Sequence, residues 1–380
     1  MLDNRRLHAI ENKGGRKGGA GRDAMRRCLL VVMLVTFVFA RGAWAAGDNG
    51  FISALEDSPL AEKAVAKYLN VFTDDLKKPF SLWLARSNRY VSVMEHILSE
   101  NDIPKDIVFL SMIESGFNPY AYSRARAVGP WQFVSATAKR YGLKINWWID
   151  ERRDPIKSTM AAAMYLRDLH NMFGSWGLAM AAYNAGEGAV KRAVEKVGED
   201  SYWELCQTRG LRNETKQYVP KFLAARTIAL DPEGHGFANI VYEGDFSYDE
   251  VVLWQPLDLE VAARCAGVGV GEIRALNPEI TRWCTPLDVK SYILRVPKNT
   301  LMVFLENLSK LTPAERLPLR SYVARRRDTL SRIARRFRLP VSVIEELNNF
   351  KTRRQRIRSG QKILLPPSGE YRSSYIVASR

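Results

Sequence analysis

Apolar residues recur at helical spacing along the first 230 residues of the chain. The stretches YLNVF and PFSLWLARSNRYVSVMEHIL are amphipathic, and apolar positions at i, i+3, i+4 and i+7 are typical of helices that pack on a core. Further helices are predicted between glycine stops, at 104–115, 131–141, 176–183, 187–197 and 213–230. The pattern predicts a helical lead-in over residues 46–84 and a compact all-helical domain over residues 85–232.

One helix of that domain has both of its ends marked in the sequence. In the segment DPIKSTMAAAMYLRDLHNMFG, Asp154 and Pro155 stand at the start and Gly174 at the end. Aspartate at the N-cap, proline in the first turn and glycine after the last turn are common helix boundaries. A helix is therefore predicted between Asp154 and Gly174.

The chain beyond residue 245 follows a different pattern and contains a repeat. LEVAARCAGVGVGEIRALNPE aligns with LSRIARRFRLPVSVIEELNNF at a constant offset of 71, which places Asn277 opposite Asn348. Each copy ends in a short apolar run stopped by proline, YILRVP and QKILLP. Two helices between two short strands fit this pattern, over residues 245–300 (the first repeat) and 320–367 (the second repeat). The expected fold class is mainly α, with small βααβ repeats after the helical domain.

The net charge of +16 is concentrated at the two ends of the chain. Residues 1–45 have the form of a secretory signal peptide, because a basic segment precedes CLLVVMLVTFVFA, and Ala43 and Ala45 form a small-x-small cleavage signal. An uncleaved membrane anchor is the alternative, although a spanning helix needs about 20 apolar residues. We expect export to the periplasm or cell envelope, with membrane association only if this segment is retained.

Residues 321–380 carry 15 basic and 4 acidic residues. Blocks such as RRRD, RIARRFR and RRQRIR can bind an anionic polymer by charge, and a solvated basic surface is the alternative. In an exported protein nucleic acid is not an expected partner. The expected partners of this segment are anionic polymers of the cell wall or membrane surface.

Three cysteines lie beyond the signal segment: Cys206, Cys265 and Cys284. Cys265 and Cys284 lie in one short segment of an exported protein, which leaves a local disulfide and two independent buried thiols as alternatives. The sequence has no CxxC pair, no HExxH motif and no histidine cluster. No metal site and no cofactor are expected.

The segment SMIESGFNPYAYSRARAVGPWQF places Glu114 at the end of an apolar run with no cation beside it. In a helix over 104–115, Ile107, Leu110, Ser111 and Glu114 share one face. Burial and the negative end of the helix dipole both disfavour the charged carboxylate, so we expect a raised pKa for Glu114. Such an acid can protonate the leaving oxygen of a glycosidic bond. The alternative is a surface glutamate at a frayed helix end.

Four spaced motifs favour the first interpretation. ESGFNP at 114, GPWQF at 129, AAYNAGEG at 181 and ETKQYVPKF at 214 occur in this order. The sequence here resembles the lytic murein transglycosylases with a goose-type lysozyme-like (SLT) fold, of the membrane-bound transglycosylase D type with C-terminal LysM modules. Pro130 is a departure, because the family usually has leucine or methionine there. The resemblance implies a lysozyme-like helical catalytic domain.

The second repeat resembles a LysM module, a small βααβ fold that binds N-acetylglucosamine-containing glycans. The resemblance rests on DTL, IA, LN and GQKILLP, and Arg327 stands where the family usually has glycine. The first repeat resembles a more degenerate relative, for which a purely structural role is an alternative. Peptidoglycan glycan strands are the partner that this resemblance implies.

The resemblance also implies roles for seven residues. Glu114 would be the sole catalytic acid and base, and the remaining six would line the sugar cleft or support it: Ser115, Gln132, Tyr183, Asn184, Glu214 and Tyr218. From the residues alone, Gln132 could equally be a helix-surface amide, Tyr183 a core aromatic and Asn184 a helix C-cap.

The expected reaction follows from the number of acids. Ordinary glycosidases use two carboxylates, whereas neighbouring arginines and a helix-cap role account for Asp150, Glu151 and Asp154. With one acid, the resemblance implies cleavage of the MurNAc-GlcNAc β-1,4 bond with 1,6-anhydroMurNAc ends. A hydrolase of the same bond and a non-catalytic peptidoglycan-binding protein are the alternatives.

Overall fold

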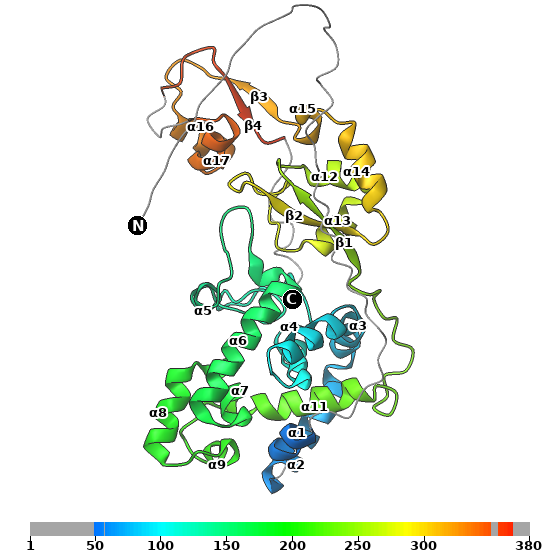
Figure 1. The fold of residues 1–380 in the computed structure, drawn as a ribbon. Coiled ribbons are helices and arrows are strands. Elements are labelled where there is room, and N and C mark those ends of the chain that lie inside the picture. The colour runs from blue at the N-terminus through cyan, green and yellow to red at the C-terminus, as the bar shows by residue number, and fades with distance from the viewer. Residues whose placement is uncertain (1–48, 57, 351–355, 368–380) are drawn as a thin grey trace, which may run out of the picture. The chain divides into compact units, whose positions relative to one another are not determined.

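The computed structural model describes residues 49–56, 58–350 and 356–367 (Figure 1). The predicted signal segment lies outside these residues. No helix within the described ranges is both long and apolar enough to cross a bilayer.

The regular elements in the first part of the described chain are all helices. Its N-terminal elements are α1 (Asn49–Glu56), α2 (Pro59–Asn70), the π-helix η1 (Val71–Asp75), α3 (Lys77–Glu100), the 3₁₀-helix η2 (Lys105–Val108) and α4 (Phe109–Ser115). Then follow α5 (Ser135–Arg140), the 3₁₀ turn η3 (Glu151–Arg153), α6 (Pro155–Phe173), α7 (Trp176–Ala185), α8 (Glu187–Val197), α9 (Tyr202–Gln207), α10 (Asn213–Lys216) and α11 (Tyr218–Leu230).

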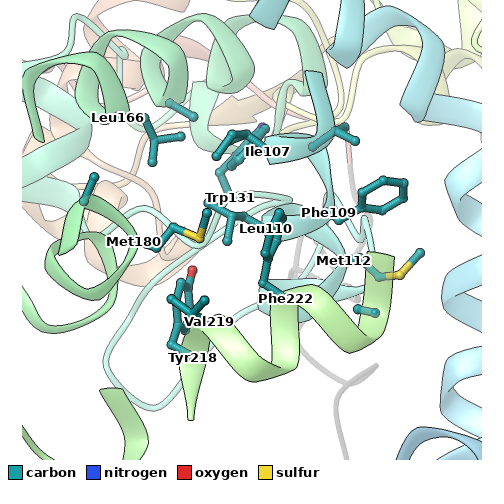
Figure 2. Close-up of a cluster of buried hydrophobic side chains, with 14 of the residues drawn as sticks. Ile107, Phe109, Leu110, Met112, Trp131, Leu166, Met180, Tyr218, Val219 and Phe222 are labelled. Carbon is teal, nitrogen blue, oxygen red and sulfur yellow. The ribbon is translucent and has the colours of Figure 1, made fainter. Parts of the chain in front are cut away.

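The core of this helical part lies between α3, α4, α6, α7 and α11. Figure 2 shows α4 and α11 contributing Leu110, Met112 and Phe222 to it, together with Trp131 from the loop before α5. All four side chains are fully buried. Because α4 lies at the centre of the core, a side chain at its C-terminal end has a fixed position.

The predicted helix ends are confirmed where the signal is local. Asp154 caps α6, since its Oδ1 accepts hydrogen bonds from the backbone N–H of Ile156 at 2.8 Å and Lys157 at 3.0 Å. Gly174 follows the last turn with φ +63°.

Three predicted helices differ in the structure. The helix expected at 104–115 begins with the 3₁₀ turn η2, and the one expected at 213–230 is divided at Gln217 into α10 and α11. The helix expected at 131–141 begins only at Ser135, because Gln132 has φ +50°, which a helix cannot include.

Each repeat forms a strand, two helices and a strand, as predicted. The first contains β1 (Tyr248–Leu253), α12 (Leu259–Ala266), α13 (Val270–Leu276) and β2 (Tyr292–Pro297). The second contains β3 (Arg320–Val323), α16 (Leu330–Phe337), α17 (Val341–Leu347) and β4 (Lys362–Leu365). In both, the two strands pair antiparallel. Two helices lie between the repeats, α14 (Leu301–Ser309) and α15 (Pro313–Arg316).

The aligned asparagines explain why the repeat is visible in the sequence. Asn277 donates to the carbonyls of Ile273 at 2.7 Å and Arg295 at 2.8 Å, and its Oδ1 accepts from the Arg295 N–H at 2.9 Å. Asn348 makes the same three bonds to Ile344 and Leu364. In each repeat one asparagine therefore ties the end of the second helix to the last strand.

The two cysteines of the first repeat do not form a disulfide. Cys265 and Cys284 are both buried free thiols. Of the two alternatives, the local disulfide is wrong and the pair of independent thiols is correct.

Candidate active site

Glu114 lies in the last turn of α4, two residues before Gly116, where the chain turns out of the helix. Gly116 caps the helix in the left-handed conformation, with φ +59° and ψ +43°. A Cβ at Gly116 would lie 2.1 Å from Cδ1 of Trp83, so no other residue fits without rearrangement. The glycine lets the chain leave α4 close against α3 and fixes the end that bears Glu114.

The Glu114 carboxyl is held by a tyrosine from a distant part of the chain. The hydroxyl of Tyr218, the first residue of α11, donates a hydrogen bond of 2.6 Å to Glu114 Oε1. In the part of the chain that the structure describes, no lysine, arginine or histidine forms an ion pair with Glu114.

The surroundings raise the pKa of Glu114 from an ordinary value of 4.5 to about 7. Desolvation by burial is the largest cause, and the negative charge of Glu214 raises the pKa further. The Tyr218 hydrogen bond and the positive charge of Lys221 lower it. The rise expected from the sequence is confirmed, and at neutral pH this carboxyl can both donate and accept a proton.

A second tyrosine lies beside the acid. The hydroxyl of Tyr183 donates to the Trp131 carbonyl at 2.8 Å, and its ring centroid lies 5.3 Å from that of Tyr165. Burial and the nearby Glu114 raise the pKa of Tyr183 well above its usual range, so this phenol stays neutral. Tyr183 thus joins α7 to the loop that carries Trp131.

Hydrogen bonds connect the loop before α5 to α4. The Pro130 carbonyl accepts hydrogen bonds from both Ser111 Oγ at 3.1 Å and Ser115 Oγ at 2.8 Å. The indole N–H of Trp131 donates to Thr159 Oγ1 on α6 at 2.8 Å. The contact is made by the backbone of Pro130, so the departure at this position leaves the fastening intact.

Several residues of the same loop adopt unusual backbone angles. Phe117, Arg126 and Gln132 have φ of +57°, +61° and +50°. Such conformations cost free energy for residues other than glycine and are concentrated at functional sites. Gln132 lies before the start of α5, so the alternative of a helix-surface amide is wrong, and its side chain donates to the Gly129 carbonyl at 2.8 Å.

Asn184 and Glu214 lie at the junction of α7 with α10. Asn184 Oδ1 accepts from Thr215 Oγ1 at 3.0 Å, and Glu214 is exposed at the start of α10. The C-cap alternative for Asn184 is wrong, because α7 continues to Ala185 and Gly186 caps it.

Each of the three other acids considered for catalysis has a cation. Arg152 forms two hydrogen bonds with Asp150, of 2.9 and 2.7 Å. Lys157 Nζ lies 2.7 Å from Glu151 Oε1. The partner of Asp154 is Arg295 of the first repeat, which the sequence did not reveal. Glu214 belongs to none of these pairs, and its negative charge acts on Glu114.

Sequence reasoning missed Lys221, Tyr165 and Thr215. Lys221 follows Tyr218 by one helical turn in the motif ETKQYVPKF, so helical spacing could have placed it on the same face. Tyr165 lies in the middle of α6 and carries no local signal of its contact with Tyr183.

Comparison with known families identifies three segments of the chain. Residues 94–206 match the transglycosylase SLT domain, residues 247–312 the LysM-like domain of lytic transglycosylase MltD, and residues 322–366 the LysM domain.

Curated relatives agree with these matches. Membrane-bound lytic murein transglycosylase D of Escherichia coli (strain K12) is 30% identical over 303 residues, which cover 76% of this chain and 63% of the relative. Membrane-bound lytic murein transglycosylase C of Photorhabdus laumondii is 26% identical over 166 residues, covering 37% of this chain and 46% of the relative. The crystal structure of the soluble lytic transglycosylase SLT70 of Escherichia coli covers 48% of this chain and 32% of its own, with 21% identity and a TM-score of 0.35. This chain thus contains three segments that match, in order, the transglycosylase SLT domain, the LysM-like domain of lytic transglycosylase MltD and the LysM domain.

Proposed function

We propose that the protein is an exported lytic transglycosylase that cleaves the MurNAc-GlcNAc β-1,4 bond of peptidoglycan, with Glu114 as sole general acid and base. The observation that carries the proposal is the environment of Glu114: a pKa raised to about 7, a hydrogen bond from Tyr218 and, within the described residues, no cation in an ion pair with it. The names of the relatives, murein transglycosylases D and C, support the substrate class.

The proposed reaction has two proton transfers at the same carboxyl group. Glu114 first protonates the glycosidic oxygen, which leaves as the 4-hydroxyl of the departing sugar while the substrate stabilises the positive charge at C1 of MurNAc. The Glu114 carboxylate then takes the proton of the MurNAc 6-hydroxyl, whose oxygen bonds to C1. The product is a 1,6-anhydroMurNAc end, no water is consumed, and Glu114 is protonated again.

The neighbouring residues have distinct proposed roles. The Tyr218 hydroxyl stabilises the Glu114 carboxylate between the two transfers through its 2.6 Å hydrogen bond. Tyr183, Asn184 and Gln132 line the sugar cleft, and Ser115 holds the loop before α5 in place through its hydrogen bond to the Pro130 carbonyl. Glu214 contributes its charge, which favours the protonated form of Glu114.

Mass spectrometry of the soluble products from murein sacculi tests the reaction. We expect muropeptides lighter by one water and without a reducing end. Glu114→Gln should abolish their release, because glutamine keeps the shape of the side chain and cannot supply a proton. Glu233→Gln, at an exposed acid far along the chain, is the control and should leave release unchanged.

Two results would refute this assignment. Products with ordinary reducing ends would mean hydrolysis, with Glu214 as the candidate base for water, and Glu214→Gln should then stop the reaction. A folded protein that is pulled down by murein and releases no fragments would be a non-catalytic binding protein.

The proposal also covers the location of the protein and the role of the second repeat. We propose that the protein acts at the periplasmic side of the cell envelope, which the relatives' designation as membrane-bound supports. The second repeat binds glycan strands as a LysM domain. Its described arginines, among them Arg325, Arg332 and Arg336, attach it to anionic envelope polymers by charge.

A further inference from the structure

The first repeat extends the backbone hydrogen bonding of the helical domain. Residues 146–154 connect the Trp131 loop and α5 to α6, and Ile149 of this segment forms an antiparallel bridge with Ile280 of the first repeat. The Asp150 N–H donates to the Glu279 carbonyl at 2.9 Å, and the Thr281 N–H donates to the Trp148 carbonyl at 2.9 Å. Thr281 Oγ1 donates to the same carbonyl at 2.9 Å. We call residues 146–154 the connecting segment.

A buried ion pair lies at the same contact. Arg295 Nη2 of β2 lies 2.9 Å from Asp154 Oδ2, and the two side chains are only 8% and 0% exposed. Glu279 is buried beside them and accepts a 2.6 Å hydrogen bond from Tyr292. The Arg295 guanidinium also lies over the Tyr248 ring, 5.2 Å from its centroid. Arg295 therefore supplies positive charge to two acids that cannot reach water.

The connecting segment in turn holds the Trp131 loop. Arg152, paired with Asp150, donates through Nη1 to the carbonyls of Arg126 and Phe133, each at 3.1 Å. The Arg152 carbonyl lies where a Cβ of Gly129 would be, at 1.8 Å, so the two backbones touch. A shift of the connecting segment must therefore move the loop between Arg126 and Phe133.

The helix α6 provides a second connection between the ion pair and the Trp131 loop. Asp154 caps α6, and Thr159, one turn further along, accepts the indole N–H of Trp131. The same aspartate thus binds Arg295 with one oxygen and fixes the start of α6 with the other.

We propose that Arg295 is a positioning residue for the Trp131 loop, and that the first repeat serves as a structural part of the helical domain. Removing the Arg295 charge leaves the buried Asp154 without its ion-pair partner and takes a nearby positive charge away from the buried Glu279, which strongly disfavours the docked arrangement. The connecting segment then loosens, and with it the backbone that carries Trp131 and Gln132. This inference rests on the proposed function insofar as it concerns catalysis.

The test uses the full chain and four variants. Arg295→Met removes the charge and keeps an unbranched apolar stem, and Arg295→Lys keeps a charge without the planar guanidinium. Lys298→Met is the matched control, because Lys298 pairs with Asp249 within the same repeat, at 2.8 Å, with a side chain 45% exposed. Thr281→Val removes only the hydroxyl that donates to the carbonyls of Trp147 and Trp148, and it is the milder variant in case Arg295→Met fails to fold.

Amide hydrogen exchange is the first readout. We expect faster exchange at residues 126–133 in Arg295→Met, unchanged exchange in α11, and wild-type behaviour in Lys298→Met. Thr281→Val should change the same residues to a smaller extent. Wild-type exchange at 126–133 in both Arg295→Met and Thr281→Val would overturn the proposal, as would an equal loss of protection throughout the helical domain.

Turnover is the second readout. We expect kcat for murein to fall by about 10- to 100-fold in Arg295→Met, because small displacements of positioning groups have effects of that size. Binding to intact murein should stay unchanged, and Arg295→Lys should recover part of kcat. Unchanged kcat in folded Arg295→Met would refute the positioning role. If the wild-type protein does not cleave murein, the proposed function fails, while the exchange measurement still decides the structural part.

Discussion

The raised pKa of Glu114 makes the folded protein less stable at alkaline pH. Because the pKa is about 7 in the folded protein against an ordinary 4.5, the unfolded chain releases the proton at lower pH than the folded one does. Between these two values the folded state binds more protons, so stability falls as pH rises through the window. Above pH 7 the carboxylate is ionised in both the folded and the unfolded state, and the full loss of folding free energy caused by burying its charge remains.

The size of this cost follows from the two pKa values. At about 1.4 kcal/mol per pKa unit, ionisation of Glu114 costs about 3 kcal/mol of stability at pH 8 and about 1 kcal/mol at pH 5. Glu114→Gln removes the titration and keeps an oxygen that can accept the Tyr218 hydrogen bond. We therefore expect the variant to gain about 2 kcal/mol more over wild type at pH 8 than at pH 5.

Urea unfolding followed by circular dichroism measures this difference, since the helical domain dominates the signal. Urea unfolding curves of wild type and Glu114→Gln are recorded at pH 5 and at pH 8. The difference between the two proteins in free energy of unfolding is then compared between the two pH values. Glu233→Gln is the control and should give the same small difference at both values. If the effect of Glu114→Gln is the same at pH 5 and pH 8, Glu114 is not desolvated in the way described, and the proton-donor role loses its physical basis.

Three further predictions follow from the site and the second repeat. Tyr218→Phe should raise the pKa of Glu114 and move the alkaline limb of kcat to higher pH, whereas Glu214→Gln should lower the pKa and move the limb to lower pH; pH-rate profiles in which both limbs move the same way would contradict this. Gly116→Ala should cost about 2 kcal/mol or more of unfolding free energy, because it adds a Cβ against Trp83 to a left-handed backbone, and thermal unfolding measures the loss. Binding of the protein to murein should weaken between low and high salt if the basic second repeat contributes through screened charges, and sedimentation with sacculi that is equal at both salt levels would contradict the role of charge.

Sequence reasoning succeeded where the cause lies within a few residues. Asp154 and Gly174 mark the ends of α6 because capping depends on backbone groups next to them. Asn277 and Asn348 revealed the repeat because each ties a helix to a strand of the same small unit. The apolar stripe before Glu114 was enough to predict its raised pKa, since burial is the largest cause.

It failed where the cause is a contact between distant segments. The positive φ of Gln132 follows from a turn held by α4, and no local residue pattern announces it. The Tyr218 hydrogen bond to Glu114 could be expected only through the family resemblance. The roles of the candidate site residues stay predictions.

Asp154 shows why one residue can mislead when its local role is sufficient. Its cap of α6 accounts fully for an aspartate at that position, so nothing in the sequence calls for a second partner. The folded chain uses the other oxygen to bind Arg295 of the first repeat. A purely structural role was one alternative for this repeat, and the buried ion pair favours it physically, because charges so far from water are stable only as long as both sides stay docked. The repeat that looked least like a glycan-binding module is thus the one that makes this buried contact with the helical domain.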